Sequence, residues 1–128
     1  MKNNKGISIQ EVMVSMIVLA VGVLGLAPLI VLSISANNLS RDVMTVSELT
    51  KEKMERYENS VLIPALPYSE TETGLSGGLY DRHTYIWDSD TDSLIPEGLC
   101  YIDVTIKWKD EAGLGHSSRA STILRKDG

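Results

Sequence analysis

Hydrophobic and polar residues divide this chain into two parts of different character. Between Val12 and Ser40 there is no charged side chain, whereas the sequence from Arg41 onward mixes charged and apolar residues. Within the first part, the apolar run from Val12 to Leu32 is interrupted only by Ser15, Gly22, Gly25 and Pro28. Because a helix of about 20 apolar residues spans a bilayer, this run predicts a transmembrane helix.

The helical pattern continues beyond the apolar run and becomes amphipathic. Apolar or small side chains recur at spacings of three and four, which is typical of one helix face; they are Leu32, Ala36, Leu39, Val43, Val46, Thr50, Met54 and Tyr57. Pro64 and Pro67 end the pattern, so the sequence predicts one long helix from Ile7 to Asn59. The apolar face of its second half requires a covering layer.

That layer is predicted from three strand-like runs, Leu79–Trp87, Leu99–Lys109 and Ser117–Arg125. The middle run alternates Ile102, Val104, Ile106 and Trp108 with polar residues, which fits a sheet with one buried face. Residues 71–78, TETGLSGG, have the composition of a turn-rich linker, and residues 110–115 that of a hairpin turn. The prediction is an α+β fold, with a long helix packed on a small antiparallel sheet of about three strands.

Length and charge restrict the function. The chain has 128 residues and a net charge of −5, which leaves room for one domain of about 100–150 residues. No basic stripe follows the N-terminal leader, so nucleic acid is not an expected partner. The single cysteine, Cys100, excludes an intrachain disulfide. We expect it to be a small apolar side chain in a strand.

Three aspartates form the only pattern that suggests a metal ligand. Asp88, Asp90 and Asp92 have the spacing that opens a calcium loop, but Ser93 and Leu99 stand where an EF-hand requires Gly and Glu. A looser calcium site, with Glu97 as a further ligand, stays open beside the alternative of a solvated loop. His83 and His116 have no metal-binding spacing with Cys100, and no serine lies in a nucleophile motif. We therefore expect a structural or assembly protein rather than an enzyme.

The N-terminal segment has two interpretations by pattern alone. A secretory signal peptide has a shorter apolar core and a cleavage site such as the Ser-Ile-Ser-Ala that follows Leu32. The helical pattern continues past this possible cleavage site without interruption, which favours a membrane helix that is kept in the mature protein. Lys2 and Lys5 then favour a cytoplasmic N-terminus, with the rest of the chain outside the inner membrane. Glu11, immediately before the apolar run, is either a solvated carboxylate at the membrane interface or a charged group with a specific partner.

The sequence around Glu11 resembles a known signal. Gly6-Ile7-Ser8-Ile9-Gln10-Glu11, followed by an apolar helix, is similar to the class III signal of type IV prepilins and pseudopilins. The resemblance implies that a prepilin peptidase cleaves after Gly6 and methylates the amine of Ile7, so that Glu11 becomes the fifth mature residue. Ile7 replaces the family's usual phenylalanine, and Ser8-Ile9 its usual Thr-Leu.

The same resemblance implies roles for further residues. The carboxylate of Glu11 would face the methylated amine of a neighbouring subunit and set the axial stagger of a filament, since a buried charge is tolerated when paired. Gly22, Gly25 and Pro28 would form a helix-breaking stretch that unwinds when the subunit enters a filament. The alternative is that Gly and Pro are simply more frequent in transmembrane helices.

The C-terminal strands, residues 101–125, are similar to the closing strands of V-type minor pilins and I-type minor pseudopilins. The chain is thus expected to be a minor subunit of a type IV pilus or a type II secretion pseudopilus. Its expected partners are other such subunits, the prepilin peptidase, the membrane and the inner-membrane assembly platform. The expected parts are a cleaved leader (1–6), a membrane helix (7–33), an amphipathic half-helix (34–60) and a β domain (61–128). The alternative is an uncleaved single-span protein with a small external binding domain.

Overall fold

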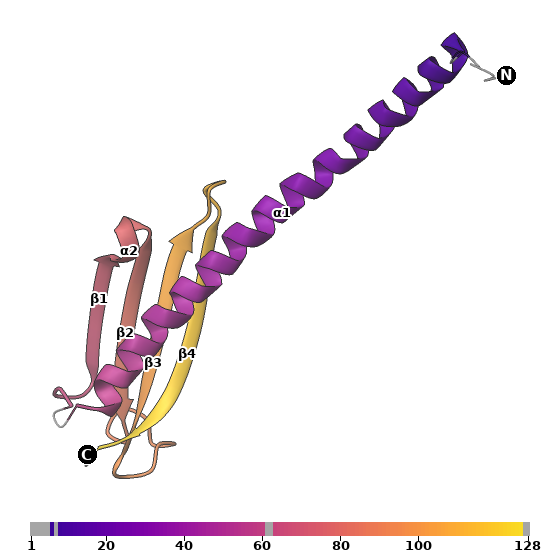
Figure 1. Cartoon of the computed structure of the whole chain (residues 1–128). Coiled ribbons are helices and arrows are strands. Elements are labelled where there is room, and N and C mark those ends of the chain that lie inside the picture. The colour runs from indigo at the N-terminus through magenta and orange to yellow at the C-terminus, as the bar shows by residue number, and fades with distance from the viewer. Residues whose placement is uncertain (1–5, 7, 61–62, 127–128) are drawn as a thin grey trace. The chain divides into compact units, whose positions relative to one another are not determined.

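The computed structural model describes residue 6, residues 8–60 and residues 63–126 (Figure 1). Contacts divide the chain into two compact units, Met1–Arg41 and Asp42–Gly128. One helix, α1 (Ile9–Glu58), belongs to the first unit up to Arg41 and to the second from Asp42 onward. All strands belong to the second unit. The predicted class, α+β with a long N-terminal helix, is confirmed.

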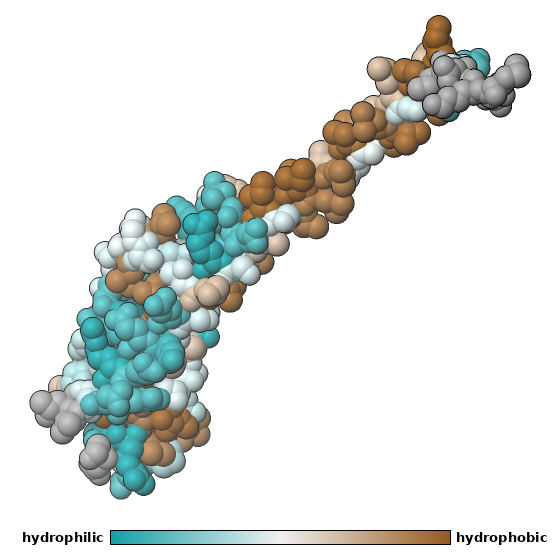
Figure 2. All heavy atoms as spheres, viewed as in Figure 1, coloured by the Kyte–Doolittle hydropathy of each residue, from teal (hydrophilic) through white to brown (hydrophobic). Residues whose placement is uncertain are grey.

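In the first unit, α1 is helical from Ile9 onward. The prediction began the helix at Ile7, which lies outside the described residues. Side chains along this part are exposed and mostly apolar, and they form the brown stretch of α1 in Figure 2. Within the described residues, α1 is long and apolar enough to cross a membrane, a property that signal sequences share.

The second unit contains a four-stranded sheet. Its strands are β1 (Tyr68–Gly74), β2 (Tyr80–Asp88), β3 (Leu99–Lys109) and β4 (Gly115–Arg125). They lie in the order β1-β2-β3-β4, and each pairs antiparallel with the next. A short helical turn, α2 (Leu75–Gly78), connects β1 to β2. The three predicted strands are present, and β3 has the predicted bounds.

The sheet has one strand more than the three runs that the sequence indicated, because β1 was not foreseen. β1 occupies residues 68–74, part of which was interpreted as the turn-rich linker. Its inward positions after Tyr68 are Glu70 and Glu72, which are partly buried between exposed Ser69, Thr71 and Thr73. Glutamate and threonine alternate in this segment, so it has no apolar periodicity. A search for alternating apolar residues therefore does not identify it as a strand. The turn itself follows immediately, at Gly74, which has φ 72°.

The core lies between one face of the sheet and the second part of α1. Its sheet side is lined by the inward residues of β2, β3 and β4, namely Tyr80, Ile86, Cys100, Ile102, Val104, Ile106 and Leu124. On the helix side, Val46 is buried, and Leu49, Met54 and Tyr57 pack against the cluster. The predicted alternation in β3 is confirmed, although Trp108 is only half-buried.

The helix face that meets the sheet differs in one respect from the predicted stripe. Val46, Met54 and Tyr57 face the core as predicted, but Val43 is 53% exposed. In its place the face includes Lys53, whose side chain is 1% exposed. A buried lysine requires a partner.

Cys100 behaves as the sequence predicted. Its side chain is fully buried in β3, and its Sγ lies 3.7 Å from the carbonyl oxygen of Leu124. It is a free cysteine. Burial raises the pKa of the thiol, so the group stays protonated and acts as a small apolar side chain.

Candidate functional site

The residues of the predicted signal lie at the start of α1. Gly6 is exposed, and Ile7, the predicted methylated residue, lies outside the described residues. Ser8 immediately precedes the helix; its Oγ accepts a hydrogen bond from the backbone N–H of Gln10 at 3.3 Å. Ser8 is therefore an N-cap, and Glu11 falls at the third helical position. The Ser-x-x-Glu spacing is that of a capping box.

Glu11 is exposed in the first turn of α1. A carboxylate there interacts favourably with the partial positive charge at a helix N-terminus. This gives Glu11 a role within its own subunit, in addition to the intermolecular role that the resemblance implies. An experiment on Glu11 must separate the two roles.

The predicted helix-breaking residues are all helical in this structure. Pro28 lies inside α1, and Gly22 and Gly25 lie in the turns before it. No side chain lies within 4 Å of where a Cβ would stand on either glycine. The loss of helical structure in a filament stays a prediction.

A cluster of charged residues between α1, β1 and β2 was not predicted. Lys53 of α1 lies 2.6 Å from Glu70 Oε2 and 2.9 Å from Glu72 Oε2. Arg82 of β2, which is 2% exposed, donates from Nε to Glu72 Oε2 at 2.7 Å and from Nη2 to Glu72 Oε1 at 3.0 Å. This is the bidentate geometry of strong arginine–carboxylate pairs. Each buried cation thus has at least one carboxylate partner.

Arg82 also reaches the backbone of α1. Its Nη1 donates to the carbonyl oxygen of Leu49 at 2.7 Å and lies 3.5 Å from Glu52 Oε2. One guanidinium group therefore connects β2, β1 and the helix. The hydroxyl of Tyr57 lies 3.4 Å from Glu70 Oε2, which extends the contacts along α1.

The cluster shifts the ionisation of its members. Hydrogen bonds from Arg82, and then from Lys53, lower the pKa of Glu72 from 4.5 to about 2 despite its partial burial. Burial, together with the neighbouring Tyr68 and Glu70, raises the pKa of Tyr57 above its ordinary value. The carboxylate of Glu72 is therefore charged throughout the physiological pH range.

Two of the three aspartates of the calcium hypothesis, Asp88 and Asp92, use their carboxylates in other contacts. Asp88 Oδ2 lies 2.6 Å from Lys126 Nζ, and Asp88 Oδ1 accepts a bond from the backbone N–H of Asp90. Asp92 Oδ1 accepts from the N–H of Leu94. The hydrogen bond from Lys126 lowers the pKa of the Asp88 carboxyl. Across the described residues, no three of His, Cys, Asp or Glu lie close enough to hold a metal ion.

The outer face of the sheet carries a row of stacked aromatic rings. Trp87 lies between Tyr85 and Tyr101, with ring centroids 5.0 Å and 5.6 Å away. Ile123 follows on β4 opposite Tyr101 and is half exposed. The rings stack on one another, so the row stabilises the pairing of β2 with β3.

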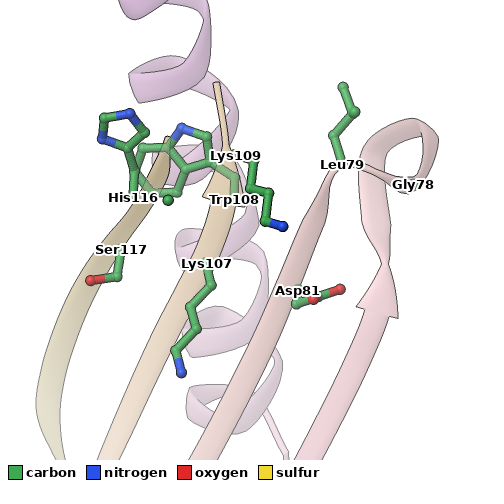
Figure 3. A pocket seen from close by; sticks show the side chains of 9 residues that line it. Gly78, Leu79, Asp81, Lys107, Trp108, Lys109, His116 and Ser117 are labelled. Atoms are coloured by element: carbon green, nitrogen blue, oxygen red, sulfur yellow. The ribbon is translucent and has the colours of Figure 1, made fainter. Parts of the chain in front are cut away.

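An open groove of about 650 Å³ lies where β2 begins and β3 ends (Figure 3). Figure 3 shows Trp108 and His116 side by side, and their ring centroids are 5.5 Å apart. His116 Nε2 lies 2.9 Å from Asp110 Oδ2. The remaining walls come from Gly78, Leu79, Asp81, Lys107, Lys109, Gly115 and Ser117. The groove brings together none of the residues of the predicted signal.

Two features of the sequence could have indicated the charged cluster. Arg82 occupies an inward position of β2, between Tyr80 and Thr84. Lys53 lies three residues after Thr50 and four before Tyr57, on the face assigned to the core. Two cations at positions of a predicted core indicate that buried carboxylates pair with them. The carboxylates could not be found in the same way, because β1 itself was not recognised.

No protein-family model matches this chain, and neither a curated protein nor a solved structure matches it. The class of the protein therefore rests on its architecture. A 50-residue N-terminal helix begins with an exposed apolar segment, and its later residues pack on a four-stranded antiparallel sheet. This architecture is pilin-like.

Proposed function

We propose that this chain is a minor pilin or minor pseudopilin, a structural subunit of a type IV pilus or type II secretion pseudopilus. The observation that carries the proposal is the combination of signal and fold. The segment Gly6-Ile7-Ser8-Ile9-Gln10-Glu11 directly precedes an apolar helix whose later part packs on an antiparallel sheet. Either feature alone is compatible with other membrane proteins.

The proposed maturation follows from the resemblance of the N-terminal sequence. The prepilin peptidase cleaves the bond between Gly6 and Ile7 on the cytoplasmic side and methylates the new amine of Ile7. The apolar segment lies after the bond, so the mature protein keeps it as a membrane anchor. Lys2 and Lys5 hold the leader on the cytoplasmic face.

The proposed assembly uses the charge of Glu11. In the inner membrane, the carboxylate lies at one end of the apolar segment, one helical turn from the mature amine. When subunits pack, the amine of one pairs with the carboxylate of its neighbour, and only one axial stagger satisfies both charges. The other partners are the inner-membrane assembly platform and subunits of similar architecture.

The mature N-terminus tests the proposal. Mass spectrometry of the protein from cells with an active prepilin peptidase should find a chain that begins at Ile7, six residues shorter than the gene product, with one added methyl group. A chain that retains Met1 under these conditions would contradict the proposal. It would favour the alternative, an uncleaved single-span protein with an external binding domain.

A further inference from the structure

One end of the sheet carries an exposed leucine in each of its two connections. β2 begins and β3 ends at this end, so the β1–β2 and β3–β4 connections both lie there. Leu79, just before β2, is 65% exposed, and Leu114, just before β4, is 64% exposed. The groove described above borders both connections, and its walls include Leu79 and Trp108 (Figure 3). Exposed apolar side chains gathered around one groove indicate an interaction surface.

This end of the sheet is also where α1 enters the second unit. Tyr80, the first residue of β2, donates a hydrogen bond from its hydroxyl to Asp42 Oδ1 at 2.8 Å. Asp42 is the first residue of that unit. At the opposite end of the sheet, Tyr57, near the C-terminus of α1, contacts the ring of Tyr68, the first residue of β1. The end with the two leucines is therefore the one from which α1 leads back to its apolar segment.

The length of α1 brings this end of the sheet close to a bilayer. The apolar run ends at Leu32, and α1 rises about 15 Å from there to Asp42. The headgroup layer on each side of the hydrocarbon is about 5–8 Å thick and covers roughly half of that rise. β3 and β4 continue past Tyr80 and are joined by residues 110–114, which adds about 7 Å beyond the start of β2. Leu114 can therefore reach the headgroups while the apolar run spans the hydrocarbon.

The side chains around the groove suit the interface between water and hydrocarbon. Trp108 is half-buried, and Lys107 and Lys109 are exposed. Tryptophan is enriched at this level of membrane proteins. Lysine extends its amine to the headgroups while its methylene chain lies against apolar groups. Two leucines, a tryptophan and two lysines at one end of a sheet thus have the composition of a membrane-contacting surface.

The charge at this end of the sheet is mixed. Asp81 Oδ1 accepts a hydrogen bond from the backbone N–H of Gly74 at 3.2 Å, and Asp110 Oδ2 lies 2.9 Å from His116 Nε2. Glu111 is exposed in the β3–β4 connection. These acidic groups offset the two lysines, so attraction to anionic lipids is weak. The free energy of a membrane contact must then come from the apolar side chains.

We infer that this end of the sheet rests on the membrane surface, with Leu79 and Leu114 inserted among the lipid headgroups. Trp108 and the two lysines lie at the level of the lipid phosphates. The inference rests on one part of the proposed function, that α1 spans the membrane. The contact holds the sheet of an unassembled subunit in one orientation, and it must break when the subunit leaves the membrane for a filament.

A fluorescent probe on the full-length protein in phosphatidylcholine liposomes tests the inference. Ala112, in the β3–β4 connection, and Ser93, in the β2–β3 loop at the opposite end of the sheet, are both exposed. A thiol-reactive probe on Ala112→Cys should be strongly quenched by lipids that carry a nitroxide on the headgroup. The same probe on Ser93→Cys should be quenched little, and the wild type, whose Cys100 is buried, controls for the labelling. Equal quenching of the two probes would overturn the inference.

Substitution of the leucines separates contact from proximity to the membrane. Added to Ala112→Cys, the pair Leu79→Ser and Leu114→Ser should lower the quenching, because the apolar surface that drives insertion is lost. Leu94→Ser replaces an 88% exposed leucine at the opposite end of the sheet. It is the matched control and should leave the quenching of the Ala112→Cys probe unchanged. Unchanged quenching in a folded Leu79→Ser/Leu114→Ser protein would overturn the inference.

The liposome assay needs neither cleavage nor a filament, so it fails separately from the test of the proposed function. A correct mature N-terminus together with unquenched Ala112→Cys would reject the membrane contact alone. Quenching that depends on Leu79 and Leu114, in a chain that cells leave uncleaved, would reject the proposed function and keep the contact.

Discussion

Arg82 Nε lies 2.7 Å from Glu72 Oε2, and the two residues stand directly opposite each other on β2 and β1. This pair attaches the edge strand β1 to the rest of the sheet. Around it, Lys53 and the carbonyl of Leu49 connect both strands to α1. The strand with the weakest hydrophobic pattern is therefore held by charged side chains as well as by its backbone pairing with β2.

Removal of Arg82 should destabilise the second unit strongly. Arg82→Ala removes the bidentate partner of Glu72 and the donor to the Leu49 carbonyl, and breaking a buried pair costs about 3–5 kcal/mol. Because Glu72 is 24% exposed, we expect the lower end of that range. Urea unfolding of the full-length protein in detergent measures the loss. Arg56→Ala, which removes an exposed pair with Glu52, is the control and should cost about 0.5 kcal/mol or less.

The free energy of unfolding should fall as the pH is lowered, because the carboxylate of Glu72 becomes protonated. Its pKa is lowered from 4.5 to about 2 in the folded protein. Its contribution to the free energy of unfolding is therefore complete above the pKa of the unfolded chain and is lost as the pH falls toward 2. Urea midpoints measured between pH 6 and pH 2 should therefore decline more steeply in the wild type than in Glu72→Gln. Parallel profiles would show that Glu72 is not strongly paired.

Trp108 should contribute to the core despite its partial exposure. It packs against the buried cluster and contacts the ring of Tyr80, with centroids 6.1 Å apart. Trp108→Ala should cost about 3 kcal/mol, the low end for truncated aromatic residues in cores. Trp108→Phe, which keeps a ring, should lose less. If the urea midpoint is the same with and without Trp108→Ala, the side chain does not support the sheet.

Gly6→Val should block processing, because a peptidase that accepts glycine at the scissile bond has no room for a branched side chain. The mutant should accumulate with its leader, as seen by electrophoretic shift or mass. Asn3→Val changes a leader residue away from the bond and should be cleaved normally. Normal trimming of Gly6→Val would reject the assigned cleavage site.

Glu11→Gln should separate the two roles of the carboxylate. Glutamine also serves at this position of a capping box, so α1 should form and insert normally, and the leader should be removed. The variant lacks the charge that we propose to pair with a neighbour's amine, so it should be under-represented in purified filaments at matched membrane levels. Glu58→Gln, at the other end of α1, is the matched control. Equal incorporation of Glu11→Gln and wild type would make Glu11 an interfacial carboxylate without a role in assembly.

The sequence predicted those parts of the fold that are built from apolar periodicity. The helix and β3 carry such a pattern, and Ile102, Val104 and Ile106 face the core as expected. β1 was missed because its inward residues are glutamates, and its stability depends on Lys53 and Arg82, which lie far away in the chain. Long-range charge pairing leaves no local periodicity to detect.

The candidate site was predictable to a different degree. Gly6, Glu11 and the start of the helix follow from a contiguous motif. The aspartates were harder to interpret, because Asp88 contacts Lys126, which is 38 positions away. A cluster of acidic residues in the sequence does not indicate whether a cation of the protein already neutralises it.

The contact between Arg82 and the Leu49 carbonyl also has a mechanical consequence. Apolar side chains on a helix exchange partners easily when the helix slides by one turn, about 5.4 Å. Such a slide would break the hydrogen bond from Arg82 to the Leu49 carbonyl and would carry the amine of Lys53 away from its carboxylates on β1. The residues four positions from Lys53, Leu49 and Tyr57, are uncharged and could not replace it. If the proposed filament is pulled along its length, shear between helix and sheet would have to break these bonds together. The second unit should therefore resist sliding until it yields abruptly.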